Sequence, residues 1–315
     1  MSWWRGGGPA LGYLFGLLGT LTLVKSASTL QAEQYLAPFA RGEKICAFAL
    51  SEPDAGTNSF NIKTTAVAEG GGFRINGNKW FITNIDNSDA LLLVAKTAPS
   101  GKEAVKSGSL SLFLIDLPNE SLDYTPIPKH GFNYYKSNQL FIEDLFVPES
   151  ALVGTLGKGF ASLAPTLNAE RLLVAAGSIG LARLALSSAV LYASERVVFD
   201  VPIGAHQAVQ HPLAAAHARL ESAWWTVRQA AAMEDQGDQS AHATALANTA
   251  KYVAVEAAID ACYHSLQAHG GAGYAREYHQ ERWWREVQLF RLAPLTQQMT
   301  LNFIGQHVLG LPRSY

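Results

Sequence analysis

Hydrophobic and polar positions divide this chain of 315 residues into three regions. Residues 1–43 carry a helical pattern, with an apolar stretch from about Pro9 to Val24 that predicts a buried helix. Residues 44–152 contain short apolar runs separated by Gly, Asn and Thr, which is typical of strands. From Gly157 onward, stripes of Ala, Leu and Val predict helices near 159–199, 203–235, 239–268, 276–291 and 294–309. The pattern predicts an α+β multidomain chain, divided at 1–43, 44–152 and 153–315, that ends in an antiparallel helical bundle.

The first region allows two interpretations. The stretch "MSWWRGGGPALGYLFGLLGTLTLVKSAS" has the outline of a signal peptide, although glycines interrupt it and it is short for a membrane span. It also fits a buried helix, which the helical pattern that follows favours. Ser28 can cap the next short helix in a capping box with Gln31, and Gly42 is expected to end that helix.

The β region carries several strand signals. Asn76-Gly77, inside "FRINGNKWFIT", predicts the turn of a hairpin. The segments "ALLLVAK", "SLSLFLI" and "SNQLFIEDLFVP" predict buried or half-buried strands. Gly70-Gly71-Gly72 is interpreted as a loop, because no helical pattern follows it as a dinucleotide-binding turn requires.

Composition excludes several classes of function. The formal net charge is -2, so the chain offers no basic field for nucleic acid. Two cysteines cannot form a disulfide framework, which favours a reducing compartment. No phosphate-binding Walker loop or GxSxG elbow is present, and His206, His211 and His217 lack the spacing of a metal pair, so no metal site is predicted.

Two segments of the β region carry candidate binding groups. "ALSEPDAGTN" offers backbone N–H groups and the hydroxyls of Ser51 and Thr57, although the same residues could form only a tight turn. "NKWFITN" places an aromatic pair beside Thr83. Hydroxyls and an aromatic side chain from two elements suit a flat aromatic heterocycle.

"ALSEPDAGTN", "INGNKWFITN", "ERVVFDVPIGAHQAVQH" and "QAHGGAGY" together resemble, in order and spacing, motifs of the acyl-CoA dehydrogenase family. The resemblance implies a helical N-terminal domain, a central β-barrel-like domain and a C-terminal four-helix bundle. It also implies FAD as cofactor and oxidation of an acyl-CoA thioester to 2-enoyl-CoA. The implied partners are the acyl-CoA substrate and an electron-transfer flavoprotein or similar acceptor, with neither nucleic acid nor membrane.

The resemblance further implies which residues bind the cofactor. Phe81 matches an aromatic that lies against the isoalloxazine, and Thr83 matches a hydroxyl near flavin N5. Thr57 and Arg171 are expected to contact substrate. The full cofactor set is Leu50, Ser51, Gly56, Thr57, Phe81, Thr83, Arg196, Phe199, Gln207, Gln267, Gly270, Gly271, Thr296 and Gln298. Because Arg196, Phe199 and Gln207 match residues that reach a neighbouring subunit's FAD, a homodimer or homotetramer is expected.

Glu170 is the candidate catalytic base. Many family members use the glutamate of a "YEGT" segment, but the aligned segment here is "APLT", with Pro294 in that place. The long-chain and isovaleryl enzymes instead use a glutamate before an arginine at the start of the long bundle helix, which matches Glu170. The alternative is a helix-start charge paired with Arg171.

Other interpretations remain open. The resemblance begins only at the last two helices of the N-terminal domain, and together with Pro294 this allows a catalytically silent or partner-dependent flavin-fold subunit. A third possibility keeps the flavin but oxidises nitroalkanes or activates oxygen. The expected location is the cytoplasm of a bacterium or the mitochondrial matrix of a eukaryote.

Overall fold

The computed structural model describes residues 8–98 and 110–313, and the chain divides into two compact units. One comprises residues 12–167, and the other joins residues 168–315 with the start of the chain. These two units follow contacts within the chain and do not test the three regions expected from the sequence, so the domain limits at residues 43 and 152 stay a prediction.

Short helices and one long helix, whose first four residues belong to the second unit, precede the sheet of the first unit. Helix α1 spans Gly8–Ser26, α2 spans Thr29–Gln31 and α3 spans Ala37–Ala40, with a π-helical stretch at residues 32–36 between α2 and α3. Ser28 Oγ accepts from Gln31 N (3.3 Å), and Gln31 Oε1 accepts from Ser28 N (3.0 Å), which confirms the predicted capping box. Gly42 follows α3 at φ +70°. The predicted helix near residues 9–24 and the predicted stop at Gly42 are both confirmed.

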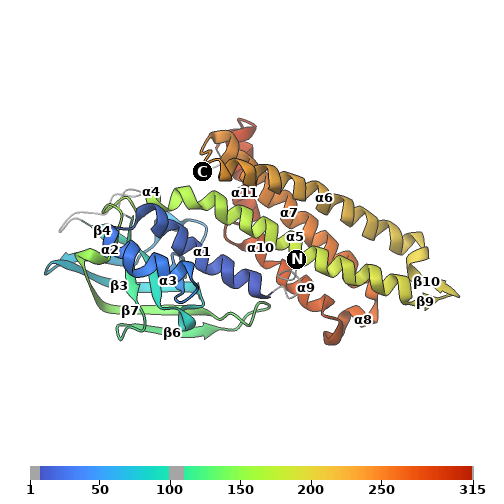
Figure 1. The fold of residues 1–315 in the computed structure, drawn as a ribbon, viewed down its shortest axis with the longest axis horizontal. Coiled ribbons are helices and arrows are strands. Elements are labelled where there is room, and N and C mark those ends of the chain that lie inside the picture. Colours follow the sequence, from blue (N-terminus) through green and yellow to red (C-terminus); the bar gives the residue numbers. More distant parts are fainter. Residues whose placement is uncertain (1–7, 99–109, 314–315) are drawn as a thin grey trace. The chain divides into compact units, whose positions relative to one another are not determined.

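An eight-stranded sheet, mostly antiparallel, forms the core of this unit (Figure 1). The strand order is β6-β7-β3-β2-β4-β5-β8, and β1 pairs with β4. Both β1 and β2 run parallel to β4. The strands are β1 (Cys46–Ala49), β2 (Thr65–Glu69), β3 (Gly72–Thr83), β4 (Ala90–Ala98), β5 (Leu110–Asp116), β6 (Leu122–Ile127), β7 (Ser137–Pro148) and β8 (Leu152–Val153). The strand predictions for β4, β5 and β7 are confirmed.

The hairpin predicted at Asn76-Gly77 is wrong. These residues lie inside β3, which pairs with β2 on one side and β7 on the other. The turn between β2 and β3 is formed instead by Gly70 and Gly71, at φ +57° and +81°. Gly77 is required by a close approach, since an added Cβ would lie 2.7 Å from Thr64 Cα. Two paired strand edges outweigh the local turn propensity of Asn-Gly.

The second unit is a helical bundle (Figure 1). Its main helices are α5 (Leu167–Glu195), α6 (Gln207–Asp235), α7 (Ala241–His269) and α9 (Gln280–Val287). Ion pairs join Arg183 of α5 to Glu221 of α6, and Arg219 of α6 to Asp260 of α7. Ile203 N donates to Arg196 O (2.8 Å), which holds the start of α6 near the end of α5, and only residues 236–240 join α6 to α7. Successive long helices therefore run antiparallel, as the pattern predicted (Figure 1). Shorter elements are α4 (Gly159–Leu163), which belongs to the first unit, and α8 (Gly271–Tyr274), α10 (Leu289–Leu292) and α11 (Gln297–Phe303).

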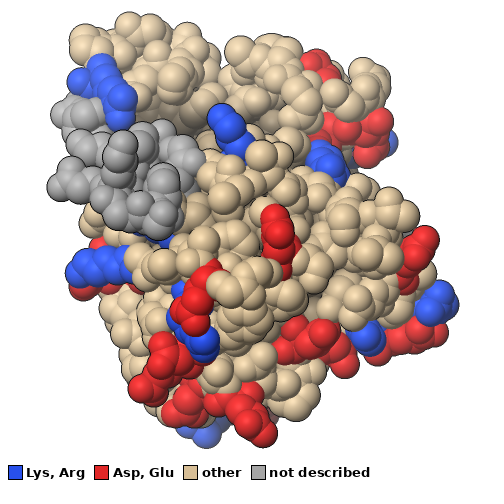
Figure 2. Space-filling view, turned by 90° about the vertical axis from the view of Figure 1, so that its left-hand side faces the viewer, with Lys and Arg blue, Asp and Glu red and all other residues tan. Residues whose placement is uncertain are grey.

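One long apolar helix and the distribution of surface charge are relevant to contact with membranes or nucleic acid. Among the described residues, Gly159–Glu195 is one helical run that is long and apolar enough to cross a membrane, but half of its apolar window is buried inside the structure. Core helices of soluble proteins share this property. On the face shown in Figure 2, acidic and basic side chains are interspersed over a mostly uncharged surface.

Candidate active site

The loop after β1 is held against β3 by backbone hydrogen bonds. Trp80 N donates to Ser51 O (2.8 Å), and Glu52 and Ala55 exchange two backbone hydrogen bonds of 3.1 Å. Gly56 and Thr57, at the tip of the loop, are exposed. The structure therefore brings the predicted residues of this loop beside the strand that carries Phe81.

A buried ion pair fixes this loop. Lys79 Nζ donates to Glu52 Oε1 and to Leu50 O, both at 2.9 Å, and the Lys79 and Glu52 side chains are 0% and 5% exposed. Glu52 also accepts from the Thr64 hydroxyl and from Lys63 N and Thr64 N. Burial lowers the pKa of Lys79 to about 8, while for Glu52 the Lys79 charge and these hydrogen bonds outweigh burial and lower its pKa. Because all the acceptors are satisfied, the pair holds Leu50 and Ser51 in one conformation.

Phe81 is presented to solvent by a strained backbone. Its φ is +59°, its side chain is 53% exposed, and its ring stacks on Trp80 with centroids 4.7 Å apart. The register of β3 against β7 shifts between Lys79 and Ile82, as in a β-bulge. Such irregularities re-aim side chains and gather at functional sites. Two residues further on, the Thr83 hydroxyl lies 3.1 Å from Ser137 Oγ.

In the bundle, six of the predicted cofactor residues gather at the far end of α5. Between α5 and α6, β9 (Val197–Val198) and β10 (Val201–Pro202) form a short hairpin whose turn carries Phe199, 86% exposed at φ +54°. Ile203 N donates to Arg196 O (2.8 Å), which brings the hairpin back to the start of α6. The exposed residues at this end are Arg196, Phe199, Gln207, Gln267, Gly270 and Gly271.

The turn after α7 is attached to α5 by a buried histidine. His269 stacks on Tyr192 with centroids 4.4 Å apart, and its Nδ1 lies 2.8 Å from Ser265 O. Burial lowers the pKa of His269 and so favours the neutral ring. Gly270 adopts φ +56° and ψ −133°, and an added Cβ at Gly270 or Gly271 would meet nothing within 4 Å. The turn therefore presents bare backbone to open space.

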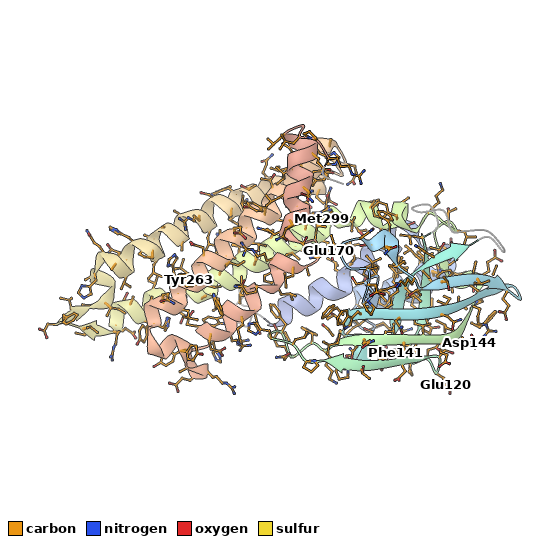
Figure 3. The ribbon with its side chains drawn as sticks, turned by 180° about the vertical axis from the view of Figure 1, so that it is seen from behind. Glu120, Phe141, Asp144, Glu170, Tyr263 and Met299 are labelled. Carbon is orange, nitrogen blue, oxygen red and sulfur yellow. The ribbon has the colours of Figure 1, made fainter. Side chains whose placement is uncertain are left out.

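Glu170 lies near the start of α5, where Figure 3 labels it. Its side chain is half-buried, and among the described residues its carboxylate has no hydrogen bond or ion pair. Burial raises its pKa to about 7, against a smaller opposing effect of Arg171. Arg171 NH1 donates instead to Asn168 Oδ1 (2.9 Å), so the structure does not form the helix-start ion pair. Glu170 is thus a carboxyl group poised to exchange a proton near neutral pH.

A second buried cation, Lys251, lies near Arg171. Lys251 of α7 is fully buried, and its Nζ donates to Leu295 O (2.9 Å). Burial, together with the nearby Arg171 charge, lowers the pKa of Lys251 to about 8. Pro294, which precedes Leu295, is exposed and offers no proton-accepting group.

The last predicted cofactor residues flank the start of α11. Thr296 caps this helix, since its Oγ accepts from Met299 N (3.3 Å) and leaves the hydroxyl proton free to donate elsewhere. Gln298 is exposed, whereas its neighbour Gln297 is buried and donates to Glu256 Oε1 (2.8 Å). Only one of the two adjacent glutamines is therefore available to a ligand.

The bundle residues thus form two groups at opposite ends of α5. Glu170 and Arg171 lie in its first turns, and Arg196 directly follows its last residue, Glu195. At 1.5 Å per residue, the ends of this stretch are about 38 Å apart. Glu170 and the Arg196 group of one chain therefore belong to separate places on the bundle.

Several polar residues that shape the candidate site were not expected from the sequence: Glu52, Lys79, Lys129, Ser137 and Lys251. A weak signal existed for Lys79, because a lysine between apolar positions of a strand must find a buried partner. Glu52 lies 27 residues away from it in the chain. No local pattern could have paired the two.

The donor set fits FAD. The exposed Phe81 ring and the Thr83 hydroxyl suit a flat heterocycle, and the exposed Arg196 and the open Gly270-Gly271 turn suit a pyrophosphate. Among the described residues, no group of three or more His, Cys, Asp or Glu side chains could hold a metal ion.

Two family models match the chain over most of its length. The acyl-CoA dehydrogenase middle domain matches residues 47–145, and the acyl-CoA dehydrogenase C-terminal domain matches residues 157–309. The matched ranges cover the sheet and the bundle that carry the candidate site. The chain belongs to the acyl-CoA dehydrogenase family.

Individual relatives agree. The chain is 40% identical over 299 residues to acyl-CoA dehydrogenase FadE12 of Mycobacterium tuberculosis, covering 94% of this chain and 75% of FadE12. It is 36% identical over 278 residues to the caffeyl-CoA reductase-Etf complex subunit CarC of Acetobacterium woodii, covering 88% and 72%. The structure of butyryl-CoA dehydrogenase from Megasphaera elsdenii superposes with a TM-score of 0.90 at 29% identity, covering 96% of this chain and 78% of that chain. The expected fold is confirmed.

Proposed function

We propose that this protein is an FAD-dependent acyl-CoA dehydrogenase that converts an acyl-CoA thioester to the 2-enoyl-CoA, with Glu170 as the base. Glu170 takes the proton from Cα of the thioester, and FAD, when bound, accepts the hydride from Cβ. The observation that carries the proposal is the half-buried Glu170 carboxyl, with no partner among the described residues and a pKa of about 7. The absence of a carboxylate at Pro294 leaves Glu170 without a competitor at that position.

The pKa of Glu170 suits this role. A general base is most effective when its pKa lies near the working pH, because it is then ionised and still basic. Arg171 donates a hydrogen bond to Asn168 rather than to the carboxylate, and its remaining donors are available to substrate. The exposed Thr57 hydroxyl is the second proposed substrate contact.

We propose that each FAD contacts residues from two copies of the chain. The isoalloxazine lies against Phe81 and Thr83, with Leu50, Ser51, Gly56 and Thr57 as further contacts. The separation of about 38 Å along α5 argues that a flavin near Glu170 of one chain meets the Arg196 end of another. That end supplies Arg196, Phe199, Gln207, Gln267, Gly270 and Gly271, while Thr296 and Gln298 add contacts from α11. A homodimer or homotetramer follows.

The direction of the reaction has two candidates. FadE12 carries the name of a dehydrogenase, and CarC that of a reductase subunit in a complex with Etf. The same base and flavin serve both directions, because a proton removed from Cα in one is returned to it in the other. We favour dehydrogenation with an electron-transfer flavoprotein as acceptor, in the cytoplasm or mitochondrial matrix.

The visible spectrum under anaerobic conditions tests the proposal. Purified protein is expected to show oxidised flavin that bleaches on addition of a saturated acyl-CoA from a panel of chain lengths. Glu170→Gln is expected to keep the flavin and lose the bleaching by a factor of about 10²–10⁴ in rate. The matched control is Glu195→Gln, which changes an exposed carboxylate at the other end of α5 and is expected to bleach normally.

Three results would decide against the proposal. A protein that FAD cannot reconstitute supports a silent flavin-fold subunit instead. A flavin that no acyl-CoA reduces, but that supports nitroalkane oxidation or oxygen activation, favours the third possibility given by the sequence. Chemically reduced flavin that an enoyl-CoA reoxidises, without bleaching by any acyl-CoA, supports the reductase direction.

A further inference from the structure

A lysine lies two hydrogen bonds away from the Thr83 hydroxyl. Lys129 Nζ donates to Ser137 Oγ at 3.0 Å, and Ser137 Oγ lies 3.1 Å from Thr83 Oγ1. Lys129 Nζ also donates to Tyr135 O at 2.6 Å, which closes the loop between β6 and β7 over the ammonium group. The three side chains form a continuous chain from a cation to a hydroxyl.

The sheet fixes this chain of side chains. Ser137 is the first residue of β7 and is paired with Thr83 of β3 on one side and with Ile127 of β6 on the other. Figure 1 shows β3, β7 and β6 side by side. Ser137 is 6% exposed, and Lys129 follows Ile127 by only two residues. Thr83 and Ser137 therefore lie on paired strand ends, and Lys129 lies in the loop that follows β6, all within one unit.

Lys129 is an unusual cation. Its side chain is half-buried, and no carboxylate among the described residues forms an ion pair with it. Burial lowers its pKa, with no carboxylate to oppose that effect. Since placing a charge away from water without a counterion is costly, the ammonium group stabilises itself through Tyr135 O and Ser137 Oγ.

The donors and acceptors orient the protons. An ammonium group only donates, so it occupies a lone pair of Ser137 Oγ. That contact makes the Ser137 hydroxyl a stronger donor and favours donation of its proton to Thr83 Oγ1. The Thr83 proton then points away from Ser137, and Thr83 has no second hydrogen-bond partner among the described residues. The Thr83 hydroxyl is therefore a hydrogen-bond donor without an acceptor among the described residues.

We propose that Lys129 and Ser137 are positioning residues that orient the Thr83 hydroxyl as a hydrogen-bond donor toward the flavin and place a positive charge behind it. This inference rests on the proposed function, in which Thr83 contacts the isoalloxazine. Uptake of a hydride would leave the neutral flavin ring with one negative charge. The positive charge of Lys129, held behind the Thr83 hydroxyl, would stabilise that anion more than the neutral oxidised ring and so raise the reduction potential.

The test is the two-electron reduction potential of the bound FAD, measured with a reference dye, together with the dissociation constant of oxidised FAD. Lys129→Met and Ser137→Ala are each expected to weaken binding of reduced FAD about tenfold more than binding of oxidised FAD, which lowers the potential by about 30 mV. The double variant is expected to match either single variant, because both break the same chain.

Two controls separate polarisation from support of the fold. Ser137→Thr keeps the hydroxyl and is expected to keep the wild-type potential. Lys136→Met removes a positive charge from the same loop, but Lys136 is 59% exposed and pairs with Asp86, so the potential is expected to stay unchanged. If Lys129→Met fails to hold flavin, Lys129→Gln, which keeps an N–H donor without the charge, gives the same reading with a smaller shift.

Each outcome has a distinct meaning. Variants that hold FAD at the wild-type potential, or that lose affinity for oxidised and reduced FAD equally, overturn the inference and leave the proposed function standing. Wild-type protein that binds no FAD overturns both. Wild-type protein whose flavin is not reduced by any acyl-CoA overturns the proposed substrate, while the shifts in potential still support the role of Lys129 and Ser137.

Discussion

Replacing Glu170 with Gln should make the protein more stable at alkaline pH while removing its activity. The pKa of Glu170 rises from its ordinary value of 4.5 to about 7 in the folded protein because of burial. A group whose pKa is raised by folding binds more protons in the folded state, so an ionisable acid of this kind loses stability as pH rises from 4.5 through 7. Glu170 is therefore destabilising at the pH where it acts as a base.

The magnitude follows from the pKa difference. A difference of one in pKa is worth about 1.36 kcal/mol, so a difference of about 2.5 corresponds to about 3.4 kcal/mol at pH 8.5. At pH 5 most of this penalty is absent, and the change expected between pH 5 and pH 8.5 is about 2.5 kcal/mol. Glutamine has a similar shape and no charge, so Glu170→Gln removes this contribution at every pH.

The assay is urea unfolding of flavin-free protein, followed by circular dichroism from pH 5 to pH 8.5. The free energy of unfolding of wild type, minus that of Glu170→Gln, is expected to fall by about 2.5 kcal/mol across this range. Other titrating groups are common to both proteins and cancel in the difference. The exposed control Glu195→Gln is expected to follow wild type.

A difference between wild type and Glu170→Gln that does not change with pH would refute this reasoning. It would mean that the carboxyl group is solvated in the folded protein and titrates as in the unfolded chain. The activity profile provides an independent check, because kcat/KM for a base of pKa about 7 rises with pH and levels off above it.

Three further predictions concern the framework of the site. Lys79→Met leaves Glu52 buried without its counterion and is expected to lower the free energy of unfolding in urea by about 3–5 kcal/mol. The double variant Glu52→Gln/Lys79→Met is expected to recover most of this loss, and equal losses in the single and double variants would contradict the pairing. Gly77→Ala forces a Cβ against Thr64 and is expected to cost about 1–3 kcal/mol, so an unchanged melting temperature would contradict the close approach. Gly270→Ala strains a backbone at φ +56° and ψ −133°, and it is expected to lower the free energy of unfolding by about 1–3 kcal/mol and to weaken FAD binding. In the control Gly56→Ala the φ is negative, so the free energy of unfolding is expected to stay unchanged.

Local patterns predicted most of the secondary structure. The long helices, the strands β4, β5 and β7, and the capping box at Ser28 depend on periodicity or on contacts three residues apart, and all are present. The failure at Asn76-Gly77 is informative for the same reason. A turn preference worth a fraction of the pairing energy is overruled when both edges of a strand find partners, and only the assembled sheet supplies those partners.

The candidate site divides in the same way. Motifs in the sequence supplied the family resemblance and the residues expected to meet FAD, and whether they do so stays a prediction. Glu52 and Lys79 are 27 positions apart in the chain, and Ser137 and Thr83 are 54 positions apart. No local pattern could reveal either contact.

The sequence alone determined which chemical groups this protein carries, since Glu170 is present and a carboxylate at Pro294 is not. Only the tertiary structure decided the state of those groups. Burial raises the pKa of Glu170, and strand pairing sets Ser137 between Lys129 and Thr83. A pKa and a hydrogen bond depend on distance and on exclusion of water, and both are properties of a folded chain rather than of its sequence of residues.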